Sequence, residues 1–145
     1  MKGDKRKIYF SGAIRAGRND VQIYHNLILY LKGFGKVLTE FVGDEATREE
    51  GEVRLKDSEI HKRDMELLKE ADIVVAEVTT PSLGVGYEIG VAVENKKPIL
   101  CLYRPGNGKL LSAMISGSPS IVVGHYDTIE DAKDIIKKFF KKVGG

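Results

Sequence analysis

The chain has 145 residues, of which 42% are hydrophobic and 30% charged, and its formal net charge is +2. This length suits one compact domain with its own core. The small charge, without a stripe of Lys and Arg among aromatic residues, argues against a nucleic-acid polymer as partner. The single cysteine, Cys101, excludes an internal disulfide and is expected to be a buried strand residue. No run is apolar and long enough to be a signal peptide or to span a bilayer, so we expect a cytoplasmic protein without a membrane partner.

Short apolar runs alternate with helical stretches in the first half of the chain. In chain order, the expected elements are a strand at 8–10, a helix at 20–31, a short strand at 36–39 and a helix from 57 to about 68. Asp57 or Ser58 can cap the last of these helices. The polar, acidic segment 43–57 is expected to be a mobile loop and is a candidate lid over a substrate.

The same alternation continues in the second half. The expected elements there are strands at 72–77, 99–102 and 121–123 and helices at 86–94, 109–116 and 129–142. Near-continuous apolar strands separated by helices indicate a parallel sheet that is covered on both faces. We therefore expect an α/β fold: one three-layer domain with a five-stranded parallel sheet in the flavodoxin-like or Rossmann-like order 2-1-3-4-5.

Glu88 is the most informative residue of the sequence. It follows the third expected strand and the glycine-bearing segment 84–90, which is expected to be a loop that leads into a helix. A carboxylate at a helix start lies at the positive end of the helix dipole, which favours its ionised form. Beside a phosphate-sized loop it suggests a nucleophile or base for a phosphorylated substrate. The glycine spacing fits neither a dinucleotide fingerprint nor a P-loop, and a tight turn with a helix-start carboxylate is the structural alternative.

A second loop, Ser11–Arg18, follows the first expected strand. It holds two glycines and two arginines, so its backbone amides can cradle an anion while Arg15 or Arg18 pairs with a phosphate. A plain turn between a strand and a helix, with exposed arginines, is an equally good interpretation of this segment alone.

Other polar residues carry weaker signals. Taken alone, Asp64 is most simply a surface charge on a helix. Three histidines, His25, His61 and His125, show no metal-ligand spacing, so we expect no metal site and no cofactor. Ser112 lies in a short apolar helix that either packs on the sheet or forms a dimer contact.

Taken together, these segments resemble the 2'-deoxynucleoside 5'-monophosphate N-hydrolases of the nucleoside 2-deoxyribosyltransferase superfamily. The resemblance runs through most of the chain: residues 8–15, 35–40, 71–78, 81–88, 97–102 and 111–115, together with Ile60, His61 and Asp64. The runs 81–88 and 111–115 make it specific, because plain strand-to-helix turns would not reproduce both.

The resemblance implies one nucleoside deoxyribosyltransferase-like domain over residues 1–145. It implies a homodimeric hydrolase, without metal or cofactor, that acts on a small nucleotide and releases the free base and 2-deoxyribose 5-phosphate. In this family the glutamate at Glu88 attacks the anomeric carbon, the tyrosine at Tyr9 orients it, and the aspartate at Asp64 is the acid/base and a sugar contact. Ser11, Gly12, Ala13, Ile14, Arg15, Ala16 and Gly17 would surround the nucleotide, Ser82 and Gly84 would hold the 5'-phosphate, Ser112 would reach that phosphate from the neighbouring subunit, and Met114 would approach the base. In the predicted sheet, Tyr9 and Glu88 are expected to be neighbours across adjacent parallel strands.

The sequence departs from the family at two positions. Serine is usual where Ala13 stands, and histidine where Phe41 stands, so we expect a changed pocket wall and a changed base or sugar preference. A nucleoside 2-deoxyribosyltransferase and a ribonucleotide N-hydrolase of the cytidylate type are the enzyme alternatives. The serines Ser82 and Ser112 favour the hydrolase, because a transferase of unphosphorylated nucleosides needs no phosphate site. A nucleotide-binding module without catalysis is the alternative of another class, and it would not need Glu88.

Overall fold

The computed structural model describes residues 6–14, 20–43, 55–106, 108 and 110–144. Five parallel strands form one sheet in the order β2-β1-β3-β4-β5, as the sequence predicted. The strands are β1 (Lys7–Ser11), β2 (Lys36–Val37), β3 (Ile73–Glu77), β4 (Ile99–Tyr103) and β5 (Val122–His125). The carboxyl ends of β1 and β3 therefore lie side by side at the centre of one sheet edge.

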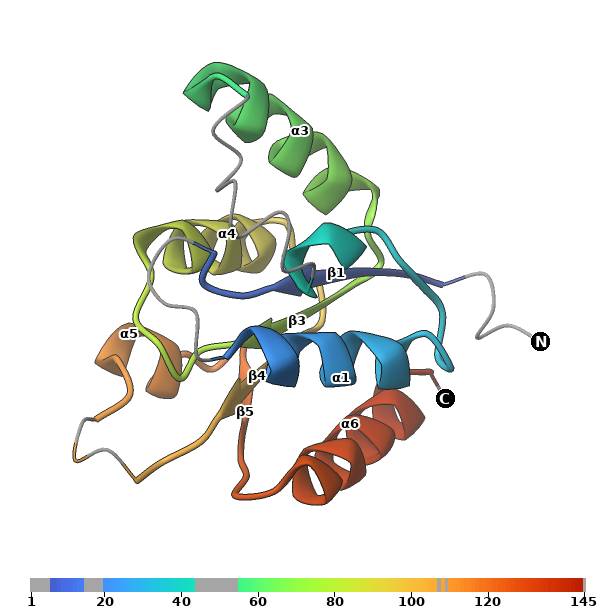
Figure 1. Cartoon of the computed structure of the whole chain (residues 1–145), viewed down its shortest axis with the longest axis vertical. Helices are drawn as coiled ribbons and strands as arrows, with labels where there is room; N and C mark the ends of the chain where they lie inside the picture. The colour runs from blue at the N-terminus through green and yellow to red at the C-terminus, as the bar shows by residue number, and fades with distance from the viewer. Residues whose placement is uncertain (1–5, 15–19, 44–54, 107, 109, 145) are drawn as a thin grey trace.

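Helices cover both faces of this sheet (Figure 1). On one face lie α1 (Val21–Leu31) and α6 (Ile129–Gly144), and on the other lie α3 (Asp57–Glu70) and α4 (Leu83–Glu94). A 3-10 turn, η2 (Glu40–Gly43), packs against α1, and a four-residue helix, α5 (Ala113–Ser116), precedes β5. No helix in the described part of the chain is both long and apolar enough to cross a membrane.

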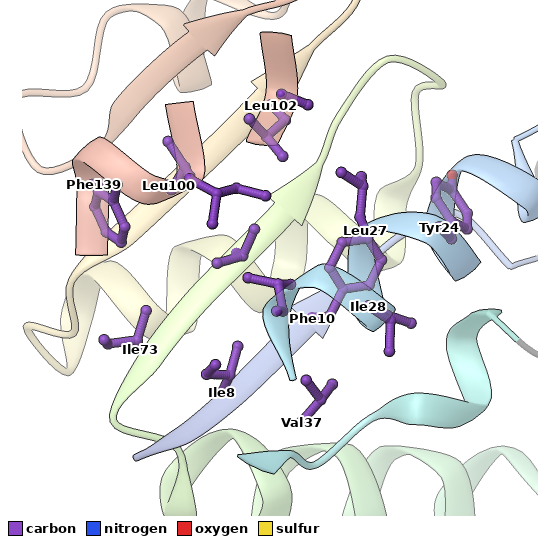
Figure 2. Close-up of a cluster of buried hydrophobic side chains, with 14 of the residues drawn as sticks. Ile8, Phe10, Tyr24, Leu27, Ile28, Val37, Ile73, Leu100, Leu102 and Phe139 are labelled. Carbon is purple, nitrogen blue, oxygen red and sulfur yellow. The ribbon is translucent and has the colours of Figure 1, made fainter. Parts of the chain in front are cut away.

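The hydrophobic core has two parts, one on each face of the sheet, because successive side chains of a strand point to opposite faces. On the α1 and α6 face, Ile8 and Phe10 of β1 pack with Leu27 and with Phe139 (Figure 2). On the α4 face, Tyr9 packs with residues that include Val74, Val85 and Ile89. Because successive side chains of a strand point to opposite faces, Tyr9 and Ser11 must both lie on the α4 face. The strand period thus brings two hydroxyl groups to one side of the sheet edge.

The start of α4 differs from the sequence prediction. The helix begins at Leu83 rather than Gly86, and Ser82 is its N-cap, with Oγ accepting a hydrogen bond from the Val85 N–H at 3.2 Å. The segment expected to be a glycine loop is therefore the first turns of a helix. The Ser82 cap and the apolar contacts of Val85 in the core outweigh the low helix propensity of glycine.

Two other elements are shorter than the sequence predicted. The second strand keeps two residues and continues into η2, and the helix expected at 109–116 is shortened to Ala113–Ser116. Most of the candidate lid, residues 44–54, lies outside the described residues. Cys101 is a fully buried residue of β4, as predicted, and burial raises the pKa of its thiol to about 12.

Candidate active site

Glu88 lies in the second turn of α4, beside the carboxyl end of β1. Tyr9 Oη donates a hydrogen bond to Glu88 Oε2 at 2.8 Å, and Ser11 Oγ donates one to Oε1 at 2.6 Å. The predicted proximity of Tyr9 and Glu88 is confirmed. Both donors come from the same face of β1, so a rigid strand holds both oxygens of the carboxyl group.

The protonation of Glu88 is set mainly by burial. Its pKa is raised from 4.5 to about 7. Burial is the largest cause and Asp64 adds to it, while the hydrogen bonds from Ser11 and Tyr9 act in the opposite direction. The expectation that a helix dipole keeps this carboxyl ionised is wrong, because Glu88 lies beyond the first turn, where the dipole effect fades. The same burial, with Glu88 and Asp64 nearby, raises the pKa of Tyr9 far above its usual value, so Tyr9 stays a hydrogen-bond donor.

This raised pKa predicts a measurable effect on stability. The carboxyl's contribution to folding is fully present below its ordinary pKa of 4.5 and is lost as the pH rises through about 7. Replacing it by a neutral amide removes that loss, so we expect Glu88→Gln to gain up to about 3 kcal/mol relative to the native chain between pH 4.5 and pH 8.5. Urea unfolding of both proteins across this range measures the difference. A difference in unfolding free energy between the two proteins that stays constant across this pH range would contradict the raised pKa.

Asp64 extends this group from α3. Its side chain is 15% exposed, and Arg63 Nε donates to its Oδ1 at 2.9 Å. Its carboxyl group also interacts with Glu88, whose pKa it raises. The simplest interpretation of Asp64 from its own surroundings in the sequence, an isolated surface charge, is therefore wrong. Two carboxyl groups and a tyrosine hydroxyl meet at one point.

A pocket of about 770 Å³ opens beside these groups. This volume is in the range of small-ligand sites. Its walls come from the segment after β1, from one face of α3 and from the start of α4. The lining residues are Gly12, Ile14, Asp57, Ile60, His61, Asp64, Met65, Pro81, Ser82, Leu83, Gly84, Val85, Tyr87 and Glu88.

The predicted site residues divide into three groups. The first lines the pocket or contacts Glu88: Tyr9, Ser11, Gly12, Ile14, Asp64, Ser82, Gly84 and Glu88. A second group lies elsewhere: Ala13 is 1% exposed and does not line the pocket, while Ser112 and Met114 belong to an exposed part of the chain at α5. The third group, Arg15, Ala16 and Gly17, lies outside the described residues.

Phe41 also lies away from the pocket lining, so the expectation that it changes the pocket wall is wrong. Its ring packs beneath the guanidinium of Arg63 instead, 4.2 Å from Arg63 Cζ to the ring centroid. Phe41 therefore contacts α3, the helix that carries Asp64, and not the pocket.

Sequence reasoning missed several residues of the α3 wall. Asp57, Ile60, His61 and Met65 line the pocket with Asp64. Their spacing of three and four places them on one face of a helix, so the periodicity of α3 could have identified them. His61 Nε2 also lies 3.1 Å from Tyr87 Oη, which joins α3 to α4 at the pocket rim.

A buried polar network holds the chain just before Ser82. Glu77 is fully buried, and burial raises its pKa. It accepts hydrogen bonds from the Thr79 N–H, from Thr79 Oγ1 and from Tyr126 Oη. Arg104 donates to Asp20 Oδ1 at 2.9 Å, and Thr80 Oγ1 donates to Asp20 Oδ2 at 2.8 Å. The network ties the segment that leads into α4 to the start of α1.

Metal binding has no evident site in this arrangement. Among the residues that the structure describes, no group of three or more His, Cys, Asp or Glu side chains is arranged to hold a metal ion. What the pocket offers chemically is a carboxyl pair, two hydroxyl donors and the N-terminus of α4.

Comparisons with known proteins find relatives that match most of this chain. A relative from Nematostella vectensis, whose name describes a 2'-deoxynucleoside 5'-phosphate N-hydrolase, is 52% identical over 139 residues, which are 93% of this chain and 94% of the relative. The 5-hydroxymethyl-dUMP N-hydrolase of Tetraodon nigroviridis is 48% identical over 138 residues, which are 92% of this chain and 96% of that protein.

A solved structure, the CMP N-glycosidase BcmB of Clostridium botulinum, has a similar fold with a TM-score of 0.65, over 92% of this chain and 99% of that one. At 17% identity this likeness concerns the fold alone. The model of the nucleoside 2-deoxyribosyltransferase family matches residues 8–115. The chain therefore belongs to the nucleoside 2-deoxyribosyltransferase family.

Proposed function

We propose that this protein hydrolyses the N-glycosidic bond of 2'-deoxynucleoside 5'-monophosphates to a free base and 2-deoxyribose 5-phosphate. The observation that carries this proposal is the Glu88 carboxyl group, held by Tyr9 and Ser11 and paired with Asp64 in a pocket of nucleotide size. The substrate class is supported by relatives near 50% identity that are named as N-hydrolases of deoxynucleoside monophosphates.

In the first step, a Glu88 carboxylate oxygen attacks C1' of the sugar. The C1'–N bond breaks, its electron pair stays on the base, and Asp64 gives the base a proton. Near neutral pH the Glu88–Asp64 pair holds a proton, because the pKa of Glu88 is about 7. The attack needs Glu88 ionised and a proton on Asp64, and the hydrogen bond between the two carboxyl groups is the route by which the proton passes from Glu88 to Asp64.

In the second step, water resolves the glycosyl-enzyme. The water oxygen bonds to C1', and Asp64, now ionised, accepts a proton from that water. The C1'–O bond to Glu88 breaks and restores the carboxylate. Tyr9 and Ser11 hold the Glu88 oxygens through both steps, so the carboxyl group does not need to reorient.

The start of α4 is a suitable seat for the 5'-phosphate. The first N–H groups of a helix lack intrahelical partners and face an incoming anion. Gly84 and Glu88 are four residues apart, hence on one face and separated by about 6 Å along the axis. That separation is on the scale of a sugar 5-phosphate. Ser82 and Gly84 line the pocket, so we assign the phosphate to them.

We extend the proposal to a homodimer in which Ser112 reaches the phosphate of the neighbouring subunit. Large apolar side chains are exposed near Ser112 in the chain, Leu110 at 95% and Met114 at 81%, and at the start of α4, Leu83 at 97%. Such a surface suits a contact between two copies of the chain, with Met114 carried toward the neighbour's base.

This arrangement predicts a selective loss in Ser112→Ala. We expect KM for a deoxynucleoside monophosphate to rise about tenfold, because one phosphate hydrogen bond is lost, while activity on the unphosphorylated nucleoside changes little. Ser112 also caps α5, accepting from the Met114 N–H at 3.2 Å, so Ser112→Gly is tested beside it, because glycine costs an N-cap less stability than alanine although it removes the same hydrogen bond. Ser120→Ala, on the exposed turn after α5, is the matched control. Equal losses on both substrates would reject the phosphate role.

The proposed activity is tested by base release from a panel of nucleotides. We expect kcat/KM for deoxynucleoside monophosphates to exceed those for deoxynucleosides and for ribonucleotides by at least about tenfold, since the site would use both phosphate and deoxyribose. Transfer of deoxyribose to an added free base would identify a transferase. Preference for a ribonucleotide would identify the cytidylate-type hydrolase. Binding without base release would leave only a nucleotide-binding module.

A further inference from the structure

We propose that Arg63 is a positioning residue for Asp64: its guanidinium, stacked on Phe41, holds the Asp64 carboxyl group in place beside Glu88. The inference rests on the proposed function for the role of Asp64, and on its own contacts for the role of Arg63. Phe41 acts indirectly, because its ring packs against the Arg63 guanidinium and supports it.

Helix geometry alone does not bring Arg63 to Asp64. Neighbouring residues of a helix point in directions about 100° apart and do not face each other. Arg63 Nε nevertheless donates to Asp64 Oδ1 at 2.9 Å, so the Arg63 side chain bends toward the next residue of α3. The Phe41 ring lies against the guanidinium, with 4.2 Å from Cζ to the ring centroid, which is well within the range of a cation–π contact. Phe41 belongs to η2, which packs on α1, so the support comes from outside α3.

The environment of α3 explains why Asp64 needs such support. Among the 14 residues of this helix, all of them described, Leu68 is the buried one. Figure 1 shows α3 standing away from the strands on the α4 side. Met65, next to Asp64, packs against the core on the α4 side. His61, which contacts Tyr87, and Arg63, which contacts Phe41, add two further contacts with the rest of the protein. These two contacts lie three residues and one residue before Asp64, so they help to fix the turn that carries it.

Arg63 also supplies positive charge to an acidic group. Asp64 interacts with Arg63 of α3, Glu88 of α4 and Tyr9 of β1. The other titratable groups that line the same pocket are Asp57, His61 and Tyr87. The charge of Arg63 reaches Tyr9, whose pKa it lowers against the larger opposing effects of burial and the two carboxyl groups. A cation at this place favours the ionised form of the Glu88–Asp64 pair. Without it, the pair would keep its proton to higher pH.

The test compares Arg63→Gln with Lys62→Gln, which removes the same charge from the adjacent, exposed position of α3. The first readout is the carboxyl ¹³C NMR titration of the pair. We expect its deprotonation to move up by about half to one pH unit in Arg63→Gln, and not in Lys62→Gln. The second is kinetics: kcat falls about tenfold in Arg63→Gln while KM stays within about threefold, because Asp64 is displaced but the phosphate seat is intact.

Two more variants separate charge from stacking. Arg63→Lys keeps the charge and loses the planar fork, so the titration should return to native while kcat recovers only in part. Phe41→Leu keeps an apolar side chain and removes the ring, so it should reproduce part of the kcat loss with Arg63 present. Identical titrations and kinetics for Arg63→Gln and Lys62→Gln would overturn the inference. If the native chain released no base, the proposed function would fail, and the NMR titration would still decide the role of Arg63.

Discussion

We expect Glu88→Gln to lower kcat/KM for base release by at least about a thousandfold, and Glu88→Ala to do the same. The amide is nearly isosteric and can keep a hydrogen bond to Tyr9 or Ser11, but it cannot form the bond to C1'. A loss of this size corresponds to about 4 kcal/mol of transition-state stabilisation. Because the pocket walls are unchanged, nucleotide binding by Glu88→Gln should stay within about threefold of native.

Two controls separate the loss of the nucleophile from the loss of a surface charge and from unfolding. Glu94→Gln changes the same residue type at an exposed position of the same helix and should keep native activity. Thermal unfolding reports whether the Glu88 variants are folded, and at pH 8 Glu88→Gln should be at least as stable as the native chain, because the buried carboxylate is gone. A Glu88→Gln enzyme that kept more than about one-tenth of the native rate would refute the nucleophile assignment.

Most of the fold could be predicted from the sequence because it depends on local patterns. Apolar runs such as 73–76 and 99–102 between helical stretches indicate a parallel sheet, and the observed strand order is the predicted one. The least accurate predictions concern Gly84 and Gly86. Glycine has a low helix propensity, but tertiary contacts of Val85 and Ile89 and the Ser82 cap start the helix three residues earlier than predicted.

The candidate site was predictable where the strand order brings residues together and unpredictable where it depends on tertiary contacts between distant segments. The predicted order of the parallel strands placed Tyr9 next to Glu88, and the structure confirms this. The protonation of Glu88 was mispredicted, since burial among packed elements, which no local pattern reports, outweighs two hydrogen bonds. The Glu77 network and the contact of Arg63 with Phe41 each join segments more than 20 residues apart, so neither had a local signal.

Asp64→Asn is expected to lower kcat/KM by about a hundredfold to a thousandfold, the range of a lost general acid/base. The charge and hydrogen bond of Asp64 both raise the pKa of Glu88, so this variant should also move the Glu88 titration below its native value of about 7. The direction is opposite to that expected for Arg63→Gln. The two variants together therefore distinguish a loss of negative charge from a loss of positive charge at the same site.

The acid/base role of Asp64 can be tested chemically, step by step. If Asp64 protonates the departing base, the defect of Asp64→Ala should shrink for substrates whose base leaves more easily as an anion. If it deprotonates water in the second step, azide should restore turnover, because azide attacks C1' without a general base and yields a deoxyribosyl azide 5-phosphate. Asp57→Asn, another carboxyl of the α3 wall, is the control and should respond to neither change. An Asp64→Ala enzyme whose defect is the same for every leaving base and is not relieved by azide would mean that Asp64 holds the sugar and transfers no proton.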